Sequence, residues 1–151
     1  RMFLGGEDVS EAIRMPQISI CASDVSSLPA VRSFLLEMQR KLAREHNVVM
    51  DGRDIGTVVL PDADLKIFLT ASAEQRAKRR MLELEAKGVN AGFDEVLKDI
   101  EYRDEQDTKR AAAPLRAAED AVHVDTSSLS FDESAAVLAE LVIDRLSPKQ
   151  E

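Results

Sequence analysis

The segment Val48-Val49-Met50-Asp51-Gly52-Arg53-Asp54-Ile55-Gly56-Thr57 decides how the rest of the chain is interpreted. An apolar run ends in a carboxylate, and a turn bounded by two glycines follows. The run predicts a strand over Val48–Asp51, and the turn places Arg53 and Asp54 beyond its end. Because ligands of open α/β sheets bind beyond the carboxyl ends of the strands, the segment indicates a site for a polar, phosphorylated small molecule. Asp-Gly is also a common turn dipeptide, so a plain β-turn is the alternative.

Strand-like and helix-like patterns alternate along most of the chain. Short apolar runs predict strands over Leu65–Leu69 and Ala121–Asp125. Apolar spacing and start signals predict helices from Pro29 to about His46, from Ser72 to about Lys87, from Phe93 to about Arg110, and from Ser130 to about Leu146. This alternation predicts an α/β fold in which helices cover a parallel sheet.

The N-terminal part has a different pattern. Arg1–Leu4 and Val9–Ile13 flank the turn-forming cluster Gly5–Asp8, which predicts an antiparallel hairpin. Residues 17–26 form a helical candidate of weak periodicity. Because a two-stranded hairpin is rarely stable alone, we expect it to belong to a larger sheet.

The composition narrows the class of protein. With 151 residues and a formal net charge of −8, the chain suits one domain, or one domain with a small appendage, and lacks the basic surface that nucleic-acid binding requires. A single cysteine, Cys21, excludes an intramolecular disulfide and fits a reducing cytoplasm. We find no signal peptide or transmembrane run and expect no membrane partner. The first residue is Arg1 rather than Met, which hints at a missing N-terminal portion.

The helix that begins at Phe93 gives the sharpest physical signal. Its apolar stripe is Phe93, Val96, Leu97 and Ile100, and steps of three or four residues continue it through Arg103, Asp107 and Arg110. Charges on a core-directed face are unfavourable unless they are paired or engaged, so the triplet predicts a polar ligand in a cleft. The alternative is a charged helix end. On that alternative the outer residues Asp104, Glu105 and Lys109 are ordinary solvated charges.

A second basic cluster consists of Arg76, Arg79 and Arg80, which share one helical face. Like charges at this spacing repel, and a polyphosphate would relieve the repulsion. Salt bridges to nearby acids such as Glu74 and Glu83 are the alternative. The two histidines are far apart in sequence and match no metal-binding spacing.

Several motifs together resemble bacterial cytidylate kinases. They are the run Asp51–Ala63 followed by Lys66–Leu69, the clusters Arg76–Arg80 and Arg103–Arg110, the short motifs Ala113–Leu115 and Asp125–Ser127, and the hairpin with Gly6–Ser10 and Ile13-Arg14. The resemblance covers essentially the whole chain. It implies a P-loop nucleoside-monophosphate-kinase-like three-layer parallel sheet, truncated at the N-terminus, with a small antiparallel insert. Residues 1–46 would form part of the CMP-binding insert, and residues 47–151 the core kinase domain with a short lid near 76–92.

The resemblance also implies an activity, which is transfer of the ATP γ-phosphoryl group to CMP or dCMP in the cytoplasm, with Mg²⁺ accompanying ATP. The residues that match the family's motifs would surround cytosine (Ser23, Arg32, Asp54), hold the pentose (Arg103, Asp107), clamp the CMP phosphate (Arg53, Arg110) and approach ATP from the lid (Arg76, Arg79, Arg80). Ser23 and Arg32 have no local signature of their own.

One departure from the family pattern concerns ATP. The chain contains no Gly-x-x-x-x-Gly-Lys-Ser/Thr phosphate loop, since Gly52 and Gly56 have the wrong spacing and no lysine follows. We therefore expect the chain to be the C-terminal two-thirds of a kinase, inactive alone and able to self-associate, from a monomeric parent. Two alternatives remain open: a non-catalytic monophosphate-binding module, and a kinase for another pyrimidine monophosphate such as UMP.

Overall fold

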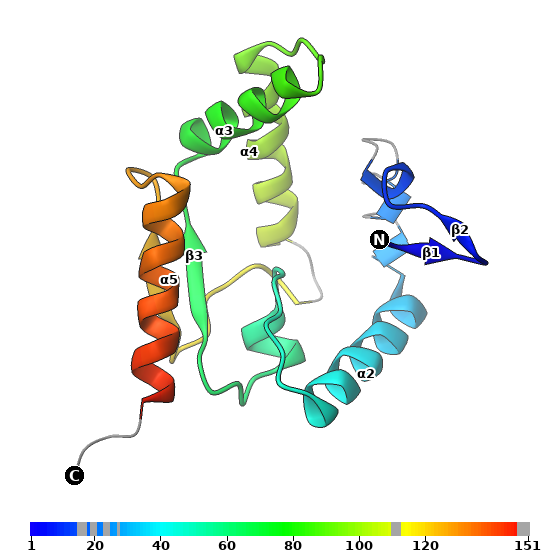
Figure 1. Ribbon diagram of the computed structural model, residues 1–151, viewed down its shortest axis with the longest axis vertical. Helices are drawn as coiled ribbons and strands as arrows, with labels where there is room; N and C mark the ends of the chain where they lie inside the picture. The colour runs from blue at the N-terminus through cyan, green and yellow to red at the C-terminus, as the bar shows by residue number, and fades with distance from the viewer. Residues whose placement is uncertain (15–17, 19–20, 23–24, 27, 110–112, 148–151) are drawn as a thin grey trace. The chain divides into compact units, whose positions relative to one another are not determined.

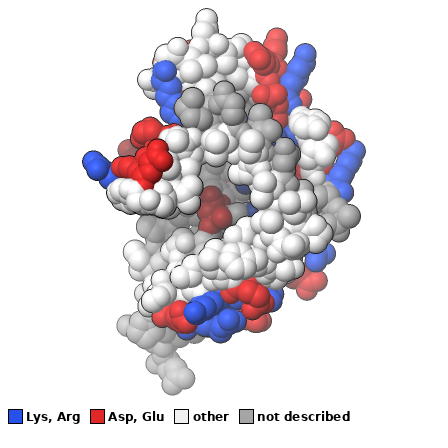
Figure 2. Space-filling view, turned by 90° about the vertical axis from the view of Figure 1, so that its right-hand side faces the viewer, with Lys and Arg blue, Asp and Glu red and all other residues white. Residues whose placement is uncertain are grey.

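The computed structural model describes residues 1–14, 18, 21–22, 25–26, 28–109 and 113–147 (Figure 1). The chain divides into two compact units, Arg1–Val49 and Met50–Glu151. None of the described helices combines the length and the apolar character needed to cross a membrane. On the face shown in Figure 2, acidic and basic side chains are interspersed rather than gathered into patches of one sign.

The first unit begins with the predicted hairpin, in a tighter form. Strand β1 (Phe3–Leu4) pairs antiparallel with β2 (Glu7–Asp8). Gly5 and Gly6 have φ values of 58° and 89°, which glycine adopts readily and which suit a two-residue hairpin turn. The second strand predicted over Val9–Ile13 is therefore wrong, because pairing starts directly after the glycines. A short 3₁₀ turn, η1 (Ala12–Arg14), follows, and the helical candidate at 17–26 lies largely outside the described residues.

The rest of the first unit is helix α2 (Pro29–Glu45), which has the predicted bounds. Pro29 stands in the first turn, where its missing N–H has no intrahelical partner to lose. The predicted apolar stripe is only partly covered within this unit: Phe34, Met38 and Leu42 are exposed, and Val31 and Leu35 are half-buried.

The sheet of the second unit consists of two parallel strands. Strand β3 (Ile67–Thr70) pairs with β4 (Val122–Asp125), which confirms two predicted strands with bounds shifted by up to two residues. The strand predicted over Val48–Asp51 is wrong. This segment pairs with no described strand, and Val49 is 100% exposed. An extended apolar run becomes a strand only where a neighbour satisfies its backbone N–H and C=O groups, and the described residues offer none.

The hydrogen bonds of this sheet leave one edge of β3 open. The N–H of Val122 donates to the carbonyl of Lys66 (2.9 Å), and the N–H of Thr126 donates to that of Thr70 (2.8 Å). Because hydrogen-bonding direction alternates along a strand, residue 68 also faces β4, while Ile67 and Leu69 direct their backbone groups to the opposite edge. No other described strand lies along that edge.

Three helices complete the second unit, and all three begin where the sequence predicts. Helix α3 (Ala73–Ala86) is capped by Ser72, whose hydroxyl accepts a hydrogen bond from the N–H of Gln75 (3.3 Å). Helix α4 (Phe93–Lys109) follows. Helix α5 (Phe131–Leu146) has the predicted capping box between Ser130 and Glu133.

A small core and a few polar contacts hold these helices, whose arrangement is shown in Figure 1. Helix α3 packs on α4, where Ala77 is fully buried (0% exposed) and Val96 is also buried. Helix α5 runs beside the sheet, and near its end Arg145 Nε donates to the carbonyl of Asp64 (2.6 Å), just before β3. The remaining buried apolar side chains among the described residues are Val59 and Val124. The second unit is thus a mixed helix–strand structure with a small parallel sheet, as an α/β fold requires.

Candidate functional site

A cavity of about 500 Å³ lies in the second unit along β3. Its walls come from the Met50–Thr57 segment, β3 and its flanks, the first turn of α3, α4, and the loop before β4. We call it the β3 trough. Its charged and hydroxyl-bearing lining residues are Asp51, Arg53, Thr57, Lys66, Thr70, Arg76, Asp104, Thr108 and Arg116.

The glycine-bounded segment predicted from the sequence leads into a turn that is wider than a β-turn. Residues Ile55–Val59 form a π-helical turn, in which the N–H of Leu60 donates to the carbonyl of Ile55 (2.7 Å). A Cβ on Gly52 would lie 2.9 Å from the Ile55 side chain, closer than real Cβ contacts, whereas a Cβ on Gly56 would make only an ordinary contact with the Lys66 side chain (3.4 Å). Asp54 occupies the N-cap position of this turn, and its carbonyl accepts from the N–H of Val58 (2.9 Å).

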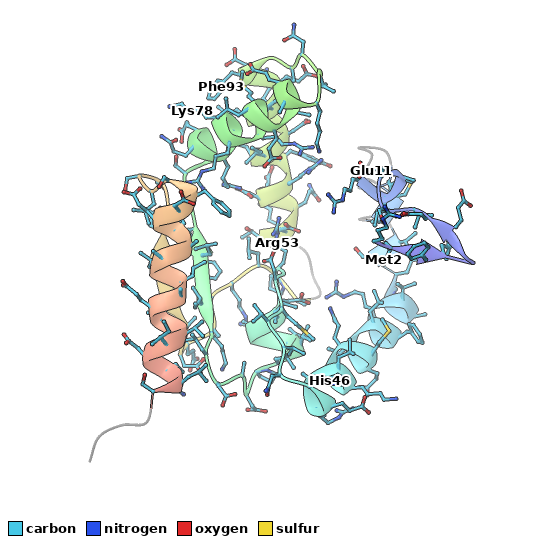
Figure 3. All side chains as sticks on the ribbon, viewed as in Figure 1. Met2, Glu11, His46, Arg53, Lys78 and Phe93 are labelled. Atoms are coloured by element: carbon cyan, nitrogen blue, oxygen red, sulfur yellow. The ribbon has the colours of Figure 1, made fainter. Side chains whose placement is uncertain are left out.

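The turn brings Arg53 to α4, 54 residues later in the sequence. Arg53 Nε donates to Asp107 Oδ2 at 2.8 Å, and Figure 3 shows Arg53 at the C-terminal end of α4. The Arg53 side chain is 56% exposed and lines the trough. Its two terminal amino groups have no hydrogen-bond partner among the described residues. A guanidinium has five N–H donors, so four remain available to an anion.

A second arginine–aspartate pair lies one helical turn away. Arg76 Nη1 and Nη2 donate to the two carboxylate oxygens of Asp104 (2.9 and 2.5 Å), and Arg76 Nε donates to the carbonyl of Ala71 (3.0 Å). The hydrogen bonds to Asp104 raise the pKa of Arg76 above its already high ordinary value. All three guanidinium nitrogens of Arg76 are therefore engaged by protein groups.

The position of Asp104 corrects the prediction that it is an ordinary solvated charge. The half-buried stripe of α4 runs from Ile100 through Asp104 to Asp107, whereas Arg103 is exposed. Since 3.6 residues make a turn, steps of three and four are both compatible with a helical stripe, and the sequence alone did not select between them. Glu105 and Lys109 do form an exposed pair four residues apart (2.5 Å), as expected of solvated charges.

The other arginines of α3 are engaged separately. Arg79 donates to the hydroxyl (3.3 Å) and carbonyl (2.5 Å) of Thr126 and to the carbonyl of Leu129 (3.1 Å), which ties α3 to the loop after β4. Arg80 forms an exposed pair with Glu83 at 3.0 Å, as the salt-bridge alternative predicted. The cluster Arg76, Arg79 and Arg80 is thus distributed over three sets of protein partners.

The remaining predicted site residues are not brought together by the described structure. Arg32 belongs to α2 in the first unit. Ser23 and Arg110 lie outside the described residues.

Sequence reasoning missed, as site residues, the four charged lining residues of the trough other than Arg53 and Arg76, namely Asp51, Lys66, Asp104 and Arg116. Asp51 had a usable signal, since it directly follows an apolar run, and Asp104 had one in its spacing from Ile100. Lys66 is largely buried and bonds both carboxylate oxygens of Asp120 (2.8 and 2.7 Å), which lowers the pKa of Asp120 below its ordinary value. No group of three or more metal-ligating side chains occurs among the residues that the structure describes.

Comparison with known proteins identifies the family of the chain. The family model for cytidylate kinase matches residues 1–144. The chain belongs to the cytidylate kinase family. Family membership implies a P-loop nucleoside-monophosphate-kinase fold, of which the described second unit shows a small parallel sheet with helices.

Curated relatives carry the same family name. The chain is 54% identical over 140 residues to cytidylate kinase of Caldicellulosiruptor bescii, which is 93% of this chain and 62% of the relative. It is 53% identical over 142 residues to that of Carboxydothermus hydrogenoformans (94% and 64%) and 52% identical over 144 residues to that of Pseudomonas syringae (95% and 63%). The chain thus spans slightly less than two-thirds of the length of these cytidylate kinases.

Proposed function

We propose that the protein containing this chain transfers the γ-phosphoryl group of ATP to CMP or dCMP, and that the β3 trough forms part of the monophosphate site. Membership of the cytidylate kinase family and relatives bearing that name support the proposal. They do not favour the alternative of a non-catalytic binding module.

The observation that carries the proposal is the way Arg53 is held. Asp107 engages only Nε, so the side chain is oriented while its two terminal amino groups remain open to the trough. Paired terminal N–H groups match two oxygens of a phosphate in a bidentate arrangement. A 5′-monophosphate bound there would accept hydrogen bonds from the two amino groups that Asp107 leaves unengaged.

Other residues of the site follow from the family resemblance. Arg110 would complete the phosphate clamp, and Arg103 and Asp107 would hold the pentose. Ser23, Arg32 and Asp54 would surround the cytosine ring and give the preference over UMP. Direct contact of Arg76, Arg79 or Arg80 with ATP would require each arginine to exchange its present partners.

Phosphoryl transfer depends on alignment and charge neutralisation rather than on covalent chemistry by the protein. Mg²⁺ bound with ATP would supply part of that neutralisation. It usually takes one or two protein carboxylates together with phosphate oxygens and water. Asp51 fits that need, because it lines the trough and no described residue pairs with its carboxylate. Arg53 would hold the acceptor phosphate in line for attack.

Steady-state kinetics of the full-length protein with CMP, UMP and AMP test the proposed function. We expect Arg53→Gln to raise KM for CMP by roughly 10- to 150-fold, the loss of one charge-assisted contact, while KM for ATP changes little. Arg44→Gln on exposed α2 is the matched control and should change neither. Titration with cytidine provides a second readout, because the Arg53 variant should bind cytidine as the wild type does. An equal loss of CMP and cytidine affinity would show that Arg53 does not recognise phosphate.

A further inference from the structure

Helix α4 is attached to the second unit in two different ways along its length. Its N-terminal half carries the apolar stripe, in which Val96 is buried, and the helix packs on α3. The apolar stripe ends at Ile100. Beyond that point the half-buried positions are Asp104 and Asp107, and Tyr102 is exposed. The C-terminal half of α4 is therefore held mainly by polar contacts.

Those contacts form two ion pairs in successive turns. Arg76, at the start of α3, donates two hydrogen bonds to Asp104, and Arg53, in the glycine-bounded turn, donates one to Asp107. One turn separates the two carboxylates along the helix, a rise of about 5 Å. The backbone adds one bond, from the N–H of Leu115 to the carbonyl of Asp107 (2.8 Å).

Of the two ion pairs, Arg76–Asp104 is the more firmly held. It is bidentate, its arginine is also fixed by the carbonyl of Ala71 just after β3, and the next residue, Ala77, is fully buried. The Arg53–Asp107 pair uses a single bond, and its arginine is more than half exposed. Bidentate pairs fix orientation as well as distance, so the first pair can set where the second one forms.

We propose that Arg76 and Asp104 are positioning residues for the monophosphate site. By fixing the C-terminal half of α4 against α3, they place the carboxylate of Asp107 at the point where it orients Arg53. This inference rests on the proposed function. It gives Arg76 a role in CMP recognition through Asp104, in place of the direct contact with ATP that the sequence resemblance implied.

The test uses Asp104→Asn in the full-length protein, with KM for both substrates, kcat and thermal unfolding measured together. We expect KM for CMP to rise about 5- to 30-fold, as for loss of a charge-assisted contact in a half-exposed setting, with KM for ATP within about twofold of the wild type. The matched control is Glu105→Gln. This variant removes a carboxylate from the adjacent residue, whose partner is Lys109 on the exposed face, and should leave both KM values unchanged.

Two further variants separate positioning from a general loss of structure. Asp104→Glu keeps the carboxylate and should recover part of the CMP affinity. Arg76→Gln should raise KM for CMP as Asp104→Asn does, and combining the two should add little more, because both break one pair. A change in thermal unfolding with unchanged KM for CMP would overturn the inference, and so would a rise confined to KM for ATP in Arg76→Gln. If the wild type does not phosphorylate CMP, both the proposed function and this inference fail.

Discussion

Replacing valine at a buried and at an exposed position tests which of the two apolar segments is packed in the folded protein. Val124 in β4 is 8% exposed and belongs to the small apolar core, whereas Val49 is 100% exposed in the segment that the sequence predicts to be a strand. Valine to alanine removes two methyl groups in both cases. Any difference between the variants therefore reports their surroundings.

The expected effects differ several-fold. At Val124, lost burial accounts for about 1.6 kcal/mol at roughly 0.8 kcal/mol per carbon, and the resulting cavity raises the total to about 2–3 kcal/mol. That is a large fraction of the 5–15 kcal/mol by which domains are typically stable. At Val49 no contact is lost, so the free energy of unfolding should change by less than about 0.5 kcal/mol.

Urea unfolding followed by circular dichroism measures both values, and an unchanged dependence on urea concentration would show that the unfolding transition remains comparable. If Val49→Ala destabilises the protein as much as Val124→Ala does, the segment is a buried strand as the sequence predicted, and the exposed position of Val49 is wrong. If Val124→Ala has no effect, the assignment of the core fails.

Further predictions concern the site, pH and assembly. Arg103→Ala and Arg110→Ala in the full-length protein should each raise KM for CMP by roughly 10- to 150-fold, with KM for ATP little changed; unchanged kcat/KM for CMP in both variants would contradict the proposed pentose and phosphate contacts. Hydrogen bonds from Ser130 lower the pKa of Glu133 below its ordinary value of 4.5. The stability that these bonds add is therefore present above pH 4.5 and is lost as pH falls through the lower pKa of the folded state. The wild type should be more stable than Glu133→Gln, and unfolding measured during an acid titration should show this difference shrink only below about pH 4.5. The 151-residue chain should not phosphorylate CMP, since it contains no phosphate loop, and a coupled assay showing CMP-dependent ADP formation at rates typical of kinases would refute this. The 151-residue chain should also self-associate through the open edge of β3, which sedimentation velocity would detect. Ile67→Pro should reduce the association, because the N–H of Ile67 faces away from β4. Phe68→Pro should instead disrupt the sheet itself, because the N–H of Phe68 faces β4.

Local signals in the sequence predicted the helices well. The helix that starts after Ser72 and the one that starts after Ser130 have capping residues at the required spacing, and these contacts form within four residues of chain. Pro29 likewise marks the first turn of α2. Such features depend on neighbouring residues alone, so no knowledge of the tertiary structure is needed to find them.

Strands were predictable only where the fold supplied a partner. The runs at β3 and β4 pair with each other, while the equally apolar run at Val48–Asp51 pairs with no described strand. Nothing in the residues of that run predicts the difference. A strand is a relation between two segments, and its stability comes from hydrogen bonds and side-chain pairs across the ladder.

The features of the site likewise divide into those that the sequence determines and those that depend on the tertiary structure. The sequence by itself determined the residue types, the glycine-bounded turn, the helical stripe ending in charges, and the motifs of the cytidylate kinase family. Only the tertiary structure decided which charges meet: Arg53 with Asp107, and Arg76 with Asp104. An ion pair forms over a few ångströms between side chains that are 28 or 54 residues apart in the chain. Its partners are therefore selected by helix rotation and packing, such as the packing of α3 on α4, and not by sequence spacing.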